Sequence, residues 1–184
     1  MVNKAVQGLI TERFGAPMWD KIRTKAGLPD EPFVSMEQYP DESTYALVGA
    51  ATTELGIGAA EILREFGRYW MLYTAQAGYG ELLESAGRTF PEFVQNLDLL
   101  HSRVKLAFPH LRPPSFSVSE LEQNRLTLHY FSSRAGLAPL VMGILDGLAE
   151  RFRIKIDMQH ETSAEGERPH ERFRLTWREG GTPV

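Results

Sequence analysis

The chain has 184 residues, of which 42% are hydrophobic and 24% charged, so it is long enough for one domain with an ordinary core. A net charge of −4 provides no basic face for a run of phosphates, which excludes nucleic acid as an expected partner. The sequence contains no cysteine, which excludes disulfides and thiolate metal sites and leaves histidine as the strong metal ligand.

The N-terminal half is predicted to be helical, with glycine and proline marking the breaks between its segments. The expected helices are 2–14, 17–26, about 42–55 and about 58–76. The start has no basic segment followed by a long apolar stretch, so we expect no secretory signal and a cytoplasmic protein. The most apolar run, 135–149, is shorter than the roughly 20 residues of a bilayer span, so we expect no membrane partner.

A longer helix is predicted from Pro91 to Phe108, with Thr89 as its N-cap. An apolar stripe recurs along it at helical spacing, made by Phe93, Leu97, Leu100 and Val104. His101 lies at the edge of this stripe and should face the interior. A buried histidine is more often a hydrogen-bonded structural residue than a ligand, and the residues alone favour that interpretation. The leucines and the valine would nevertheless form the apolar surround that an axial histidine beneath heme iron requires.

The second half changes from helical periodicity to the alternation of half-buried strands. Expected strands are 115–118, 126–132, 154–158 and 173–177, with a helix over about 136–152 and a loop over 161–171. These segments predict a small antiparallel sheet with a helix laid across it. The fold class is therefore α+β, with one domain over residues 1–178 and a loose tail over 179–184.

Polar side chains continue the apolar face of the strand over 126–132. Alternation places Tyr130, Ser132 and Arg134 in line with Leu126 and Leu128. A phenol, a hydroxyl and a guanidinium all donate to anionic oxygens, so two carboxylates of one ligand would satisfy them. The spacing fits equally well a strand end that reaches solvent, with Arg134 simply hydrated.

These residues together resemble those of the heme-nitric oxide/oxygen binding (H-NOX) family. Tyr130-x-Ser132-x-Arg134 matches the family's Y-x-S-x-R motif, at the expected distance after a histidine like its proximal ligand, His101. The likeness covers nearly the whole chain and is greatest to cyanobacterial members and to the heme domain of soluble guanylate cyclase. Further matching segments are 2–5, 45–51, 78–83, 111–116 and 136–152.

The resemblance implies a heme b cofactor. His101 would ligate the iron, and Tyr130, Ser132 and Arg134 would hold the propionates. Pro114 matches a proline that packs on the heme and helps to distort it; without the resemblance it would be interpreted as a plain loop proline.

The resemblance also identifies the distal pocket. Leu140 stands where oxygen-binding members have a tyrosine that donates to bound dioxygen. The other matching positions are Val2, Val6, Trp70 and Ile144, which are apolar apart from the indole N–H. Bound dioxygen depends on a donor much more than NO or CO does, so we expect NO and CO to bind and oxygen to be excluded.

The implied function is a sensor in which NO weakens the bond between iron and His101, so that the helix over 91–108 shifts. Flattening of the heme against Pro114 would move the rest of the domain. No kinase or cyclase segment fits in 184 residues, so a separate histidine kinase or cyclic-dinucleotide enzyme is the expected partner. A peroxidase would need a distal acid–base residue, and the matched positions offer none. A gas carrier or store remains open, whereas His101 argues against a heme-free relative.

Overall fold

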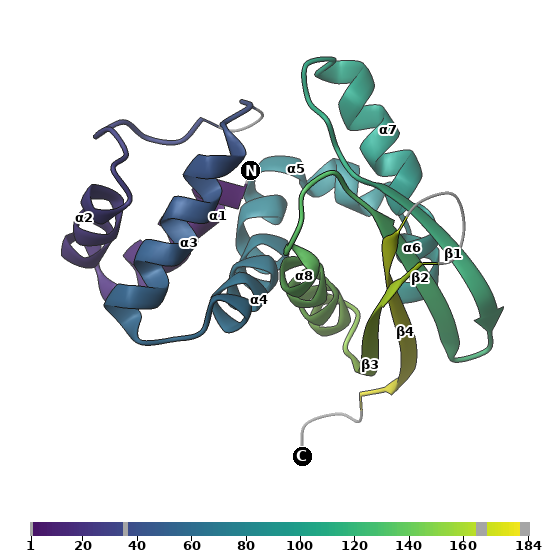
Figure 1. The fold of residues 1–184 in the computed structure, drawn as a ribbon. Helices are drawn as coiled ribbons and strands as arrows, with labels where there is room; N and C mark the ends of the chain where they lie inside the picture. The colour runs from purple at the N-terminus through teal and green to yellow at the C-terminus, as the bar shows by residue number, and fades with distance from the viewer. Residues whose placement is uncertain (1, 35–36, 165–168, 181–184) are drawn as a thin grey trace.

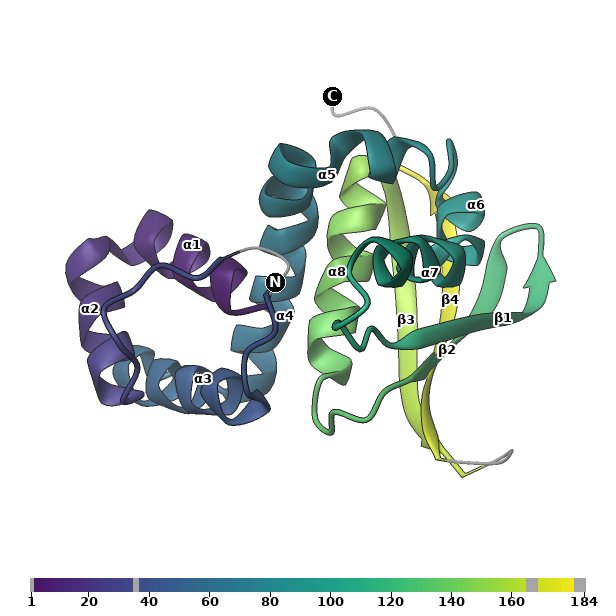
Figure 2. The same ribbon diagram turned by 90° about the horizontal axis from the view of Figure 1, so that it is seen from above.

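The computed structural model describes residues 2–34, 37–164 and 169–180, and of residues 2 and 74–79 it describes the backbone elements alone. The chain forms two lobes with two helices between them (Figures 1 and 2). One lobe contains α1 (Val2–Phe14), α2 (Ala16–Lys25) and α3 (Asp41–Leu55). The other contains the sheet and the short helices α6 (Phe90–Gln95) and α7 (Leu97–Ala107), and α4 (Ala59–Tyr69) and α8 (Ala138–Arg151) lie between the two.

The helical lobe has its own core, which α1 to α4 enclose together with the start of α8. The largest fully buried side chains there are Ile10, Ile22, Leu47 and Phe66. A buried polar contact ties the first helix to the third, because Thr44 Oγ1 donates to Asn3 Oδ1 at 2.8 Å. The three predicted helices are confirmed to within one residue at each end.

The segment predicted as one helix over 58–76 is longer and has three parts. After α4 the chain forms a π-helix, η1 (Trp70–Thr74), and then α5 (Ala75–Glu84). A π-helical turn inside a helix often marks a functional site. Among the described residues no single helix could cross a membrane; only α3 together with Ala59–Tyr73, a pair bent by 110°, has the length and composition.

The second half forms a four-stranded antiparallel sheet, which confirms the predicted α+β class. Its spatial order is β1-β2-β4-β3, with β1 (Ser115–Glu122), β2 (Arg125–Phe131), β3 (Ile154–Ser163) and β4 (His170–Glu179). Strands β3 and β4 extend into the segment predicted as a loop over 161–171. Strand β4 also includes Glu179, where the predicted tail begins; residues 181–184 of that tail lie outside the described part of the chain.

One face of the sheet packs against α6, α7 and α8 in a second core. Its fully buried members include Phe90, Phe93, Leu128, Leu148 and Phe173. The predicted single helix over 91–108 is wrong, because the chain breaks at Asn96 into α6 and α7. The Asn96 amide donates to the Ala86 carbonyl at 2.8 Å, which holds the break in place.

Glycines let α4 and α8 approach until their backbones touch. A Cβ atom on Gly143 would lie 2.7 Å from the Arg64 carbonyl carbon, and one on Gly67 would lie 2.8 Å from Ile144 N. Both distances are shorter than real Cβ contacts allow, so side chains at these positions would force the helices apart. The close approach of the two helices therefore depends on glycine at these positions.

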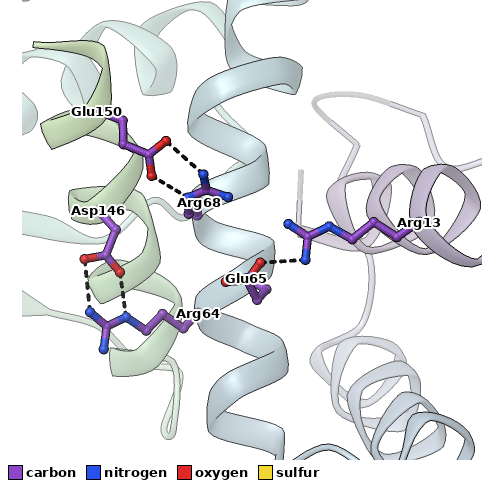
Figure 3. Close-up of polar contacts among 6 residues, drawn as sticks. All are labelled: Arg13, Arg64, Glu65, Arg68, Asp146 and Glu150. Atoms are coloured by element: carbon purple, nitrogen blue, oxygen red, sulfur yellow. Dashed lines mark hydrogen bonds and ion pairs between the residues drawn. The ribbon is translucent and has the colours of Figure 1, made fainter. Parts of the chain in front are cut away.

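Ion pairs follow this helix contact on its exposed side (Figure 3). Arg64 donates through Nε and Nη2 to Asp146 at 2.5 and 3.0 Å, and Arg68 donates in the same way to Glu150. Both are forked pairs, the geometry that guanidinium and carboxylate favour. On the opposite side of α4, Glu65 forms an ion pair with Arg13 of α1 at 2.8 Å.

Candidate functional site

His101 lies in the first half of α7, and the break at Asn96 positions it. Thr89 caps α6 by accepting from Glu92 N at 3.4 Å, as predicted. Helix α7 then starts anew at Leu97, and its first turn carries Asp98, which accepts from Phe116 N at 2.9 Å. This bond fastens the start of β1 to the helix that carries the histidine.

The imidazole of His101 has one nitrogen engaged and one available. Its Nδ1 lies 2.7 Å from the Leu97 carbonyl oxygen. A carbonyl can only accept, so Nδ1 carries the proton and Nε2 keeps its lone pair. Burial lowers the pKa of His101, against the opposing effects of the Leu97 carbonyl and Asp98. The ring is therefore neutral near pH 7, which is the form that binds metal.

Phe116 stands between His101 and Tyr130. Its ring centroid lies 5.0 Å from that of His101 and 5.4 Å from that of Tyr130. Tyr130 is buried near the end of β2, with 5% of its surface exposed. Burial raises its pKa, although the Ser132 hydroxyl bond and the charge of Arg134 act in the other direction, so the phenol is a neutral donor near pH 7.

Ser132 and Arg134 lie beyond the strand, so the predicted alternation ends at Phe131. The Ser132 hydroxyl accepts from the backbone N–H of Arg134 at 3.0 Å. The Arg134 guanidinium forms an ion pair with Asp41, at the start of α3, at 2.7 Å. The three residues of the motif thus lie together, and the arginine is held by the helical lobe.

Two links from α3 to this loop were not foreseen. Besides the pair of Asp41 with Arg134, the Tyr45 hydroxyl donates to the Ala135 carbonyl at 3.0 Å. Nothing in the sequence signals either contact, because the partners are about 90 residues apart. The contact of Phe116 with His101 and Tyr130 was not predicted from the sequence either, although Phe116 comes shortly after the predicted site residue Pro114.

The remaining predicted residues around His101 lie on α7 and before β1. Leu97 and Val104 are buried and Leu100 is half-buried, and Leu97 and Leu100 belong to the core beneath the sheet. Pro114 is half-buried, one residue before β1. The predicted apolar stripe is therefore present, although Phe93 contributes to it from a separate helix.

The predicted distal residues lie where the two cores meet. Trp70 packs against the core beneath the sheet, Val6 and Leu140 belong to the helical-lobe core, and Ile144 contacts both. The side chain of Val2 lies outside the described residues. The indole Nε1 of Trp70 is buried and has no hydrogen-bond partner among the residues that the structure describes. An unpaired buried donor is costly, which favours a site that receives a ligand.

These residues fit a heme group better than a bare metal ion. Among the described residues no group of three or more His, Asp or Glu could hold a metal ion. A single imidazole lone pair instead suits a metal that already has four ligands in a macrocycle. The apolar surround suits the flat macrocycle of such a group. The Tyr130–Ser132–Arg134 cluster suits its carboxylates, and the unpaired indole donor suits a ligand bound to its metal.

The fold is that of solved H-NOX proteins. The structure of an H-NOX protein from S. oneidensis in the Fe(II)NO state superposes with a TM-score of 0.84 and 20% identity, over 96% of this chain and 97% of that one. An unliganded Fe(II) H-NOX protein from K. algicida gives a TM-score of 0.83 and 22% identity, over 100% and 98%. At these identities the comparison shows the fold.

The family follows from the sequence comparison: residues 1–160 match the Haem-NO-binding family model, and the chain belongs to this family. Soluble guanylate cyclase gcy-31 of Caenorhabditis elegans is 28% identical over 162 residues, which are 85% of this chain and 23% of that protein. Guanylate cyclase soluble subunit beta-2 of Rattus norvegicus is 35% identical over 115 residues, 59% of this chain and 17% of its own. The chain thus spans less than a quarter of the length of these relatives.

Proposed function

We propose that this domain is a heme-based sensor of NO and CO that excludes oxygen and signals to a separate partner protein. The observation that carries the proposal is the state of His101. Its Nδ1 is fixed on the Leu97 carbonyl, so the unprotonated Nε2 is available to a metal, and the Phe116 ring links His101 to Tyr130 of the Tyr130–Ser132–Arg134 cluster. This hydrogen bond determines the tautomer and the ring orientation, as it does for most metal-ligating histidines.

Heme b would supply the iron that binds the gas. His101 would hold it from the α7 side, with Leu97, Leu100 and Val104 around the ring and Pro114 against the plate. Tyr130, a neutral donor, and Ser132 would bind the propionates. Arg134 would bind them either while it keeps its ion pair with Asp41 or after that pair breaks, since its guanidinium has donors besides Nε.

The gas preference follows from the distal side chains. Leu140 has no donor, and Val6 and Ile144 are aliphatic, so dioxygen would lack the strong hydrogen bond that stabilises its partial negative charge. The Trp70 indole N–H is the one donor among these distal positions, and NO and CO do not require it. We therefore expect stable NO and CO complexes and no stable oxygen complex.

Signalling would pass through the helix that carries the ligand. A change in the bond to His101 acts on α7, and α7 is tied to β1 by the contact of Asp98 with Phe116 N. The domain is expected to have no catalytic role of its own. A histidine kinase or a cyclic-dinucleotide enzyme is the proposed partner.

The test compares visible spectra of the reduced protein with those of two variants. We expect an intense Soret band in the wild type that shifts with NO and CO and not with air. His101→Gly should lose the band and regain it with added imidazole. Exposed His110→Gly, which removes a histidine after the end of α7, should leave the spectra unchanged. A protein that takes up no heme refutes the proposal, and a stable oxygen complex refutes the gas preference alone.

A further inference from the structure

An open groove of about 450 Å³ contains a concentration of charge, and none of its lining residues belongs to the candidate site, although α8 contributes to both. Its walls come from α4 and α8 on one side and from the first residues of β3 with Arg178 of β4 on the other. Both faces of β3 contribute, since Ile154 and Ile156 point to the core and Lys155 and Asp157 point away from it. The groove therefore runs around the edge of this strand.

Two cations in the groove face each other. Lys155 and Arg178 are direct partners in the antiparallel pairing of β3 with β4, and both are exposed. Like charges in that position repel. Within the described part of the chain neither forms an ion pair, and Asp157, the nearest carboxylate along β3, forms none either. An anion placed between the two cations would remove the repulsion.

The opposite wall presents further donors in fixed positions. Arg64 and Arg68 are each held by a forked pair through Nε and Nη2, so the Nη1 hydrogens of both remain available (Figure 3). The carboxylates of these pairs also line the groove, so it contains anions as well as cations. Continuous polyanions such as nucleic acid would meet the carboxylates, whereas separated negative charges would fit between them.

Strand β3 adds a second kind of complementarity. Among the described strands it is an edge strand, in the order β1-β2-β4-β3, so alternate residues along it have no partner in that sheet for their backbone N–H and C=O groups. Such an edge binds extended peptides by adding a strand. Alternate side chains of an added strand point the same way, which suits carboxylates at every second position.

We infer that this groove binds an extended acidic segment of a partner protein, through its carboxylates on Lys155 and Arg178 and its backbone on the β3 edge. This inference goes beyond gas sensing and does not depend on it. Because α4 and α8 form the other wall, the segment would contact the helices that join the two lobes.

The test uses a fluorescein-labelled peptide of eight residues in which glutamate alternates with threonine, with fluorescence anisotropy as the readout on the heme-loaded protein at low salt. We expect Lys155→Glu/Arg178→Glu to weaken binding about tenfold or more. The control Arg112→Glu/Arg125→Glu makes the same change in net charge at exposed positions outside the groove and should change binding less than about twofold.

A peptide with glutamine in place of glutamate should not bind. On adding the acidic peptide, the largest changes in backbone amide NMR chemical shift should fall in residues 154–157. Circular dichroism should show that both double variants remain folded. Equal loss in the two double variants, or no binding by the wild type, would overturn the inference. Equal affinity for a single-stranded oligonucleotide would also overturn it, since the groove would then be a general polyanion site.

Discussion

Replacing Gly143 by alanine tests whether the separation of α4 and α8 is set by backbone contact. The added Cβ would lie 2.7 Å from the Arg64 carbonyl carbon and 2.9 Å from Arg68 N, and both are backbone atoms that cannot turn aside. Overpacking of this kind costs roughly 1–3 kcal/mol. Alanine regains about 1 kcal/mol through its higher helix propensity. Because the Cβ would also overlap the Arg64 carbonyl oxygen, the cost should lie in the upper part of that range, at about 2–3 kcal/mol, and we expect the free energy of unfolding to fall by about 1–2 kcal/mol.

The matched control is Gly49→Ala in α3. A Cβ there would meet nothing within 4 Å, so the same chemical change should stabilise the protein by about 0.5–1 kcal/mol. The two variants therefore differ in the sign of the effect.

Urea unfolding followed by circular dichroism measures both changes, with the midpoint and the slope fitted separately. If Gly143→Ala is as stable as Gly49→Ala, the close approach of α4 to α8 does not depend on glycine, and the reasoning fails. A crystal structure of Gly143→Ala should show wider helix separation and longer distances from Arg64 to Asp146.

Three further predictions concern other side chains. Trp70→Phe removes the indole N–H that would bond to the ligand, so CO should dissociate about 2–10 times faster, and an unchanged rate in flash photolysis would contradict this. Arg134→Ala should weaken heme retention about tenfold or more because a charge-assisted bond is lost. Asp41→Ala should not weaken it, as measured by heme transfer to a scavenging globin. Burial, with the bond to Glu12, raises the pKa of Tyr69 to about 12. The folded state then keeps a proton that the unfolded state loses, so stability present below pH 10 should decline towards pH 12, and Tyr69→Phe should lack this decline.

The element types of this fold could be predicted because periodicity carries them. The alternation of Leu126, Leu128 and Tyr130 indicated a strand, and all three are buried as expected. The boundaries were harder to predict. Strand β3 extends to Ser163 through residues as polar as those of a loop, because pairing with β4 satisfies their backbone groups.

The break at Asn96 shows why one periodic stripe became two helices. The apolar spacing from Phe93 to Val104 satisfies a single helix, and the sequence contains no glycine or proline between them. The break depends on the bond from the Asn96 amide to the Ala86 carbonyl, ten residues earlier. Such tertiary contacts cannot be seen in a local pattern.

The candidate site could be anticipated only in part for a related reason. His101, Tyr130 and Arg134 were recognisable as a motif, whereas Asp41 is one acidic residue at a helix start among many. Its contact with Arg134 arises from the way that α3 meets the loop after β2. The two residues are far apart in the sequence, so their ion pair can be seen only in the folded structure.

The glycines and arginines of the α4–α8 contact also fix its register. The pairs of Arg64 with Asp146 and of Arg68 with Glu150 run in the same direction along both helices, and each helix spaces its partners by four residues. A slip of one turn would leave a single pair, and it would carry either Pro139 or Arg151 into a position that now holds glycine. Some conformational switches shift one helix along another by one turn, and the ion pairs and glycines of this contact oppose such a shift. We therefore expect a displacement imposed on α8 to move α4 in the same direction.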